Sequence, residues 1–391
     1  MKHPRLHGLA LACLLALPAA AFADGVAPPK GISAGPCVEG ICEYRMGNGL
    51  RVLLFPDASK PTVTVNLTYL VGSVHENYGE TGMAHLLEHL LFKGTPSHGD
   101  IPGELKKRGA SFNATTSLDR TNYFSSFPAN DATLDYVLGL EADRMVNSFV
   151  AKKDLDSEMT VVRNELERNE NNPGSVLGQR LRSTAYLWHN YGNTTIGARS
   201  DVEHVPIERL QAFYRTWYQP DNATVIVAGR FDAERVLKSV QASFGKLKRP
   251  TRTLPPHYTV EPTQDGEREI NVRRVGDLNL VGLTYHTPAA THPDNAALDV
   301  LADIMGHTPS GRLHKALVEA KLAVASAAGS DSFRDPGLAL FLAVPPKDGN
   351  PAEAEKVLLA QVEGLADKPF TAEEVEAAKQ RFANSFELSF N

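Results

Sequence analysis

Residues 51–228 alternate between two patterns of apolar and polar positions. Short runs of β-branched and apolar residues predict strands, and longer segments with apolar residues at every third or fourth position predict helices. Because the two kinds of segment alternate, the pattern predicts domains of the α/β or α+β class. The predicted strands are 51–55, 62–70, 111–116, 122–127 and 225–228, and the predicted helices are 81–92, 101–108, 132–147 and 153–170.

A change in composition between residues 248 and 266 marks a predicted domain boundary. Prolines and basic residues replace the periodic pattern there. The chain has 391 residues, which suits two domains better than one hydrophobic core. We therefore interpret 43–247 as a first domain, 248–266 as a linker and 267–391 as a second domain. The last helical pattern, 371–390, has no terminating glycine or proline, so we expect the second domain to be incomplete.

A weak internal repeat relates the two domains. The segment VGLTYH at 281–286 is similar to VNLTYL at 65–70, at a shift of 216 residues. In this register the polar residues His85, Glu88 and His89 are replaced by Leu301, Ile304 and Met305. We therefore expect the second domain to contain the same helix without its polar side chains.

The first 23 residues have the three parts of a secretory signal. Lys2 and Arg5 give a positive start, 9–17 is apolar, and Ala-Phe-Ala at 21–23 is a cleavage site. We expect a mature start at Asp24 and a periplasmic or secreted protein without a membrane anchor. The alternative is an uncleaved anchor, which needs a longer apolar run.

Composition and charge narrow the choice of partners. Hydrophobic residues make up 42% and charged residues 22% of the chain, which is typical of globular proteins. The net charge is −6, with acidic and basic residues interspersed. Since no long basic run is present, we do not expect a nucleic acid partner.

Residues 24–42 are rich in glycine, proline and alanine, and we interpret them as an extended N-terminal arm. Cys37 and Cys42 lie near its end in the segment CVEGIC. In an oxidising compartment this spacing favours a small disulfide loop. The alternative is a metal site, but two thiols alone lack further ligands.

The strongest chemical signal is the segment His85-Leu86-Leu87-Glu88-His89. Residues four apart on a helix differ by about 40° in direction, so both imidazoles can reach one metal ion. Glu88 lies on the same side of the helix. The surrounding residues are nearly all apolar, and polar groups in a buried helix are costly unless they are paired or bind a metal.

A hydrolytic zinc site needs a third protein ligand and an open position. The predicted helix 153–170 offers Glu158 and Glu165, which are seven residues apart and share one edge of its apolar stripe. One of them can bind the metal while the other accepts a hydrogen bond from a ligand histidine. Spacing alone does not say which glutamate has which role.

The segments GETGMAHLLEHLLFKGT and VVRNELERNENNP resemble the inverted zinc motif of the insulinase and pitrilysin peptidases. The resemblance implies one zinc ion per chain held by His85, His89 and Glu165, with Glu158 as a supporting carboxylate. It also implies that the strand with Asn113 and Ala114 contacts substrate. The implied fold is α+β: two similar α/β sandwich domains, each with helices packed on a mixed, largely antiparallel sheet.

The resemblance implies a zinc-dependent endopeptidase in which Glu88 activates water to cleave extended peptides or unfolded proteins. Such enzymes usually combine two halves, from a continuing chain, a homodimer or a heterodimer. The opposing half commonly supplies an arginine and a tyrosine that hold the substrate, and we find no matching segment here. The alternatives are a non-catalytic or partner-dependent subunit and another metal hydrolase, such as an amidase.

Overall fold

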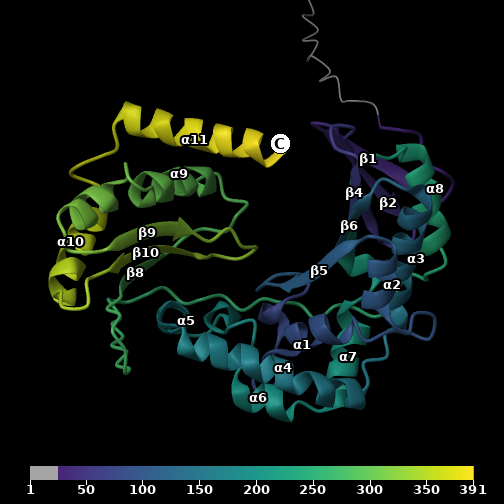
Figure 1. Ribbon diagram of the computed structural model, residues 1–391, viewed down its shortest axis with the longest axis horizontal. Coiled ribbons are helices and arrows are strands. Elements are labelled where there is room, and N and C mark those ends of the chain that lie inside the picture. The colour runs from purple at the N-terminus through teal and green to yellow at the C-terminus, as the bar shows by residue number, and fades with distance from the viewer. Residues whose placement is uncertain (1–24, 391) are drawn as a thin grey trace, which may run out of the picture.

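A seven-stranded sheet forms the centre of the first domain (Figure 1). The structure is a computed structural model that describes residues 25–390, so the predicted signal segment lies outside the described residues. The strand order is β1-β2-β3-β7-β4-β6-β5, and only β3 and β7 pair in parallel. The strands are β1 (Ile32–Val38), β2 (Ile41–Met46), β3 (Arg51–Pro56), β4 (Thr62–Tyr69), β5 (Ser111–Thr116), β6 (Thr121–Pro128) and β7 (Ala223–Gly229).

Helices pack on this sheet and on one another. The helix α1 contacts β5 and β6 of the sheet and also contacts α4 and α7, so it lies between the sheet and a further layer of helices. On another part of the sheet, α3 packs against β4 and α8. The helices are α1 (Met83–Leu90), α2 (Ile101–Lys107), α3 (Asp131–Asn147), α4 (Lys152–Asn171), α5 (Pro173–Ala185), α6 (Arg199–His204), α7 (Ile207–Trp217) and α8 (Ala233–Phe244), with short 3₁₀ turns η1 (Ser73–His75), η2 (Asn190–Gly192) and η3 (Pro220–Asn222).

The predicted N-terminal arm, 24–42, contributes β1 and the first two residues of β2 to the sheet. Residues of β1 and β2 form an antiparallel hairpin in which Cys37 lies opposite Cys42, and the two are joined by a disulfide. The glycines and prolines of this segment hide its strand character in the sequence, because alternation is weak there. The hairpin forms the edge of the sheet opposite β5.

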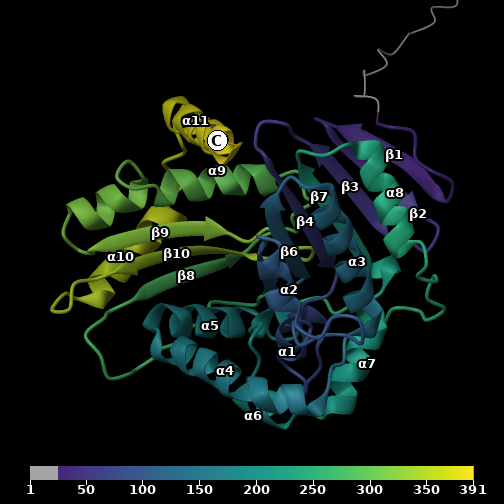
Figure 2. The same cartoon turned by 45° about the vertical axis from the view of Figure 1, so that its right-hand side comes forward.

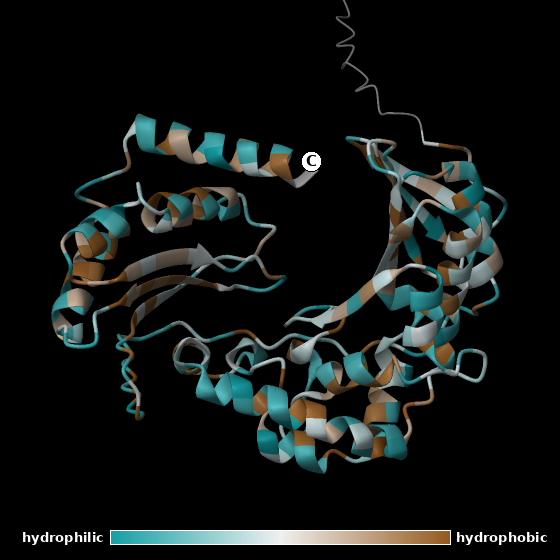
Figure 3. Cartoon of the chain, viewed as in Figure 1, coloured by the Kyte–Doolittle hydropathy of each residue, from teal (hydrophilic) through white to brown (hydrophobic). Residues whose placement is uncertain are grey.

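The second domain is built on a smaller antiparallel sheet in the order β8-β10-β9 (Figure 2). The helix α9 packs against β9 and β10, and α10 packs against β8 and β10. The apolar residues visible on these strands in Figure 3 fit that packing. The elements are β8 (Val281–His286), α9 (Asn295–Gly306), η4 (His314–Glu319, a π-helix), β9 (Ala325–Ser330), β10 (Leu338–Val344), α10 (Pro351–Glu363) and α11 (Ala372–Phe390).

The two domains share the strand and helix that the internal repeat predicted. The strand β8 contains the repeated segment that corresponds to β4, and α9 contains the positions that correspond to α1. Ile304 and Met305, which replace Glu88 and His89, are both buried in the second domain. The expected α+β class, with helices on mixed and largely antiparallel sheets, is confirmed.

A coil at residues 245–280 connects the domains, and it is longer than the predicted linker. The helix α5 of the first domain packs against β8 of the second. A small apolar cluster also joins them, with Tyr186 and Tyr191 from one side and Leu338 from the other. No helix within residues 25–390 has both the length and the apolarity needed to cross a membrane.

Candidate metal centre

The helix α1 is held firmly at its N-terminal end. Its N-cap, Gly82, has φ 95°, and a Cβ atom there would lie 2.7 Å from the backbone oxygen of Ile196, so glycine is required. The carboxylate of Glu76 accepts hydrogen bonds from the backbone N–H groups of Gly82 at 2.7 Å and Ala84 at 2.8 Å. These bonds satisfy N–H groups that a helix start leaves without partners. The helix therefore presents His85 and His89 from a fixed position.

Three side chains from α1 and α4 converge on one point. His85 Nε2 and His89 Nε2 lie 3.3 Å apart, and Glu165 Oε2 lies 3.4 Å from the first and 3.6 Å from the second. Zinc bonds of about 2.0–2.2 Å in a tetrahedron place neighbouring ligand atoms about 3.3–3.6 Å apart. The donor set and its spacing therefore fit zinc, with one position left for water or substrate.

Glu158 lies behind His89. Its Oε2 is 3.2 Å from His89 Nδ1, and its other oxygen pairs with Lys93. Partial burial alone would raise the pKa of Glu158, but the hydrogen bond from Lys93, followed by that from His89, holds it below the usual value. An ionised Glu158 keeps the ring proton of His89 on Nδ1 and leaves Nε2 free for a metal. The structure thus distinguishes the two glutamates that spacing left equivalent.

Glu88 is half-buried and lines the same cavity as His85 and Glu165. Thr116 at the end of β5 donates a hydrogen bond of 2.5 Å to Glu88 Oε2. Burial raises the pKa of Glu88, although the hydrogen bond from Thr116 opposes that effect. Burial also lowers the pKa of His85 to about 4, with a further contribution from His89, so His85 is neutral at pH 7 and can bind a metal.

The strand β5 borders the site at the end of the sheet. A cavity of about 330 Å³ is lined by His85, Glu88, Ala114 and Glu165 together with other residues of β5 and α4. Ala114 is buried toward this side of the strand, whereas Asn113 is exposed and does not line the cavity. Within the described chain, β5 pairs only with β6, so its outer edge keeps free backbone groups.

Comparison with known proteins supplies the context for this geometry. Residues 51–199 match the family described as Insulinase (Peptidase family M16), and residues 204–382 match the Peptidase M16 inactive domain. The zinc protease PqqE of Helicobacter pylori is 34% identical over 393 residues, which cover 97% of this chain and 85% of that protein. The chain belongs to peptidase family M16.

Solved structures agree with the M16 assignment. The crystal structure of a protease from Helicobacter pylori has a TM-score of 0.84 at 32% identity, covering 88% of this chain and 84% of that one. The first half of the periplasmic protease PqqL from Escherichia coli has a TM-score of 0.70 at 23% identity, covering 91% and 79%. Against the whole of PqqL, the match covers 41% of that chain. At this identity the PqqL likeness shows the M16 fold alone.

Replacing Glu158 by glutamine is expected to weaken zinc binding by about 10–100-fold, because His89 loses the carboxylate that fixes its ring and Lys93 loses its partner. Titration of zinc against a competing chelator measures this affinity. Glu167→Gln is a matched control on the same helix, since Glu167 is 58% exposed and pairs only distantly with Arg199. Equal zinc affinity in the two variants would refute the supporting role of Glu158.

Sequence reasoning missed two side chains that contact glutamates of the candidate site: Thr116 contacts Glu88, and Lys93 contacts Glu158. From the sequence, Thr116 is only the end of a predicted strand, and Lys93 is only part of the segment that resembles the zinc motif. The alternation in β5 places Thr116 on the same side as Phe112 and Ala114, and this pattern is the signal that could have indicated it. Lys93 lies four residues after His89, but nothing in the sequence identifies Glu158 as its partner.

Proposed function

We propose that this M16 chain is a zinc-dependent endopeptidase that cleaves extended peptides or unfolded proteins in the periplasm. The observation that carries the proposal is the convergence of His85, His89 and Glu165 beside Glu88 at a cavity bordered by a free strand edge. Relatives named zinc proteases support the same reading. One hydrolytic zinc ion is expected at this centre.

The chemistry follows from the arrangement of the four side chains. Zinc held by His85, His89 and Glu165 would act as a Lewis acid. It would lower the pKa of a bound water and polarise the scissile carbonyl. Glu88 takes the proton of the attacking water and returns it to the leaving amine. We assign the proton to Glu88 Oε1, since Oε2 accepts the hydrogen bond from Thr116.

The substrate is expected to bind as an added strand along β5. A free strand edge offers backbone N–H and C=O groups, and pairing with them recognises an extended chain with few demands on its side chains. Ala114 is small and buried beside the cavity, so a substrate backbone can approach closely there. The side chain of Asn113 points to the opposite face of the strand from Ala114. Any contact of Asn113 with the substrate is therefore expected to be made by its backbone groups.

Three observations support the proposed compartment. The predicted signal at 1–23 would direct export, and the Cys37–Cys42 disulfide suits an oxidising environment. The structural neighbour PqqL is described as a periplasmic protease. These observations support a periplasmic mature protein.

A second candidate function is a partner-dependent subunit. The match to PqqL covers 41% of that chain, which supports an assembly of two halves in which this chain supplies the metal half. The match of residues 204–382 to a domain described as inactive is compatible with this arrangement. The second half would come from another copy or from a different chain.

The deciding experiment combines zinc analysis with cleavage of an unfolded fluorogenic peptide by the purified mature chain. We expect bound zinc, cleavage that a zinc chelator stops, and recovery when zinc is returned. Size-exclusion fractions separate monomer from dimer during the assay. Bound zinc without cleavage in any fraction would favour the partner-dependent subunit, and absence of zinc binding would exclude both candidates.

A further inference from the structure

A second group of metal-binding side chains lies where the two domains and the connecting coil meet. His189 is the N-cap of η2, His257 lies in the coil, and Asp335 lies between β9 and β10. Their donor atoms lie within 4.8 Å of one another, as do those of the group at α1. We propose that His189, His257 and Asp335 bind a second divalent cation of the zinc type, which ties the coil to both domains.

The spacing of the donor atoms carries this proposal. His189 Nε2 lies 3.3 Å from His257 Nε2, and Asp335 Oδ2 lies 3.4 Å from the first and 3.5 Å from the second. These distances match the edges of a zinc tetrahedron, about 3.3–3.6 Å. The corresponding distances at the α1 centre are 3.3, 3.4 and 3.6 Å. The chain therefore contains the same triangle of two imidazoles and one carboxylate twice.

The charges around the group favour a cation on balance. Asp119 and Glu261 add two carboxylates to that of Asp335: Asp119 accepts a hydrogen bond from the backbone of Arg334, and Glu261 accepts one from the backbone of His189. Two cations oppose these three carboxylates: Arg334 donates a hydrogen bond of 2.9 Å to Asp335 Oδ2, and Arg268 lies 4.0 Å from Glu261. A carboxylate oxygen can accept this bond and still coordinate a metal, since it has more than one lone pair.

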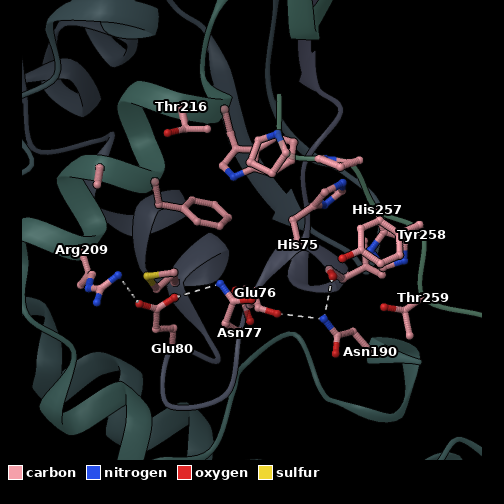
Figure 4. A pocket seen from close by; sticks show the side chains of 17 residues that line it. His75, Glu76, Asn77, Glu80, Asn190, Arg209, Thr216, His257, Tyr258 and Thr259 are labelled. Atoms are coloured by element: carbon pink, nitrogen blue, oxygen red, sulfur yellow. Dashed lines mark hydrogen bonds and ion pairs between the residues drawn. The ribbon is translucent and has the colours of Figure 1, made fainter. Parts of the chain in front are cut away.

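The group is also accessible. His189 is buried, but His257 lines a cavity of about 360 Å³ together with His75, Asn190 and Tyr258, as Figure 4 shows. On another side, His257 borders a cavity of about 680 Å³. A metal ion can therefore enter from solvent, and its fourth position can be filled by water.

The alternative is a hydrogen-bonded cluster without metal. The backbone N–H of Tyr191 donates to His189 Nδ1 at 3.2 Å, so a neutral His189 carries its proton on Nε2 and directs it toward Asp335. Metal binding moves that proton to Nδ1 and breaks the bond from Tyr191. Metal binding therefore replaces two hydrogen bonds of His189, from Tyr191 and to Asp335, with three coordination bonds, which favours the bound state when zinc is present.

Counting bound zinc tests the proposal without reference to peptidase activity. The chelator-stripped full chain is titrated with Zn²⁺ alone and its content is measured by mass spectrometry. We expect two equivalents in the wild type and one in a variant with His85→Ala and His89→Ala. Adding His257→Gln to that variant should remove the remaining equivalent. Adding His292→Gln, at an exposed histidine of the second domain, should leave it.

Thermal unfolding provides an independent readout. Zn²⁺ should raise the melting temperature of the variant that lacks His85 and His89, and this rise should vanish when His257→Gln is added. Asp335→Asn preserves the side-chain shape and serves if His257→Gln does not fold. The proposal is overturned if the variant without His85 and His89 binds no Zn²⁺. It is also overturned if that variant still binds one equivalent after His257→Gln and after Asp335→Asn. The cluster would then be the hydrogen-bonded alternative.

Discussion

Replacing Glu88 by glutamine is expected to lower the rate of peptide hydrolysis by about 10²–10⁴-fold while the zinc content stays unchanged. Glutamine keeps the shape of the side chain and can still accept the hydrogen bond from Thr116, but it cannot take a proton from water. The three ligand side chains are untouched. The measurement pairs kcat/KM on an unfolded peptide with zinc content of the same sample.

Two controls sharpen this test. Glu167→Gln makes the same chemical change at an exposed position of α4 and should leave kcat/KM unchanged. Thr116→Val removes the hydrogen bond to Glu88 and should cause a smaller loss than Glu88→Gln. Full activity in the Glu88→Gln enzyme would falsify the role of Glu88 as the proton carrier.

Replacing Glu165 by glutamine is expected to weaken zinc binding more than replacing Glu158 does. Loss of a supporting carboxylate such as Glu158 costs about 10–100-fold in affinity. The Glu165 substitution removes the charged oxygen that lies within 3.6 Å of both ligand imidazoles. Activity should fall in parallel with occupancy and recover in part when zinc is added in excess. Competitive zinc titration followed by the peptide assay measures both.

Three of the glutamates of α4, namely Glu158, Glu165 and Glu167, make a graded series on a single helix. We expect zinc affinity to fall most for Glu165→Gln, less for Glu158→Gln and not at all for Glu167→Gln. The order follows from the distances, since Glu165 reaches the Nε2 atoms and Glu158 reaches Nδ1 of His89. If Glu158→Gln lowered zinc affinity more than Glu165→Gln, then Glu158 would be the metal ligand and Glu165 the supporting carboxylate.

Local patterns predicted the elements around the site well. The strand 111–116 has the bounds of β5, and the helices 101–108 and 153–170 differ from α2 and α4 by one residue at an end or at both. These segments are regular, amphipathic and bounded by turn residues, so local preference and tertiary packing agree. The hairpin of β1 and β2 was missed, because its own alternation is weak and β2 is joined to the sheet by pairing with β3, a contact between separate segments.

The sequence could not assign partners that depend on contacts between distant segments. The spacing of Glu158 and Glu165 placed both on one edge of a helix, but only the packing of α4 against α1 separates their roles. The group of His189, His257 and Asp335 has no recognisable spacing at all. Its members come together because the coil and the loop between β9 and β10 meet at the domain junction.

The position of β5 at the margin of the sheet has a consequence for substrate choice. In a folded protein most main-chain amides are already engaged, so the proposed strand pairing would mainly select segments that have come loose. The choice of substrate would then depend on the local stability of the substrate protein (the client) rather than on side-chain contacts made by the enzyme. Across a set of clients of similar sequence, the cleavage rate would follow the free energy of local opening, and well-folded neighbours in the same compartment would be spared.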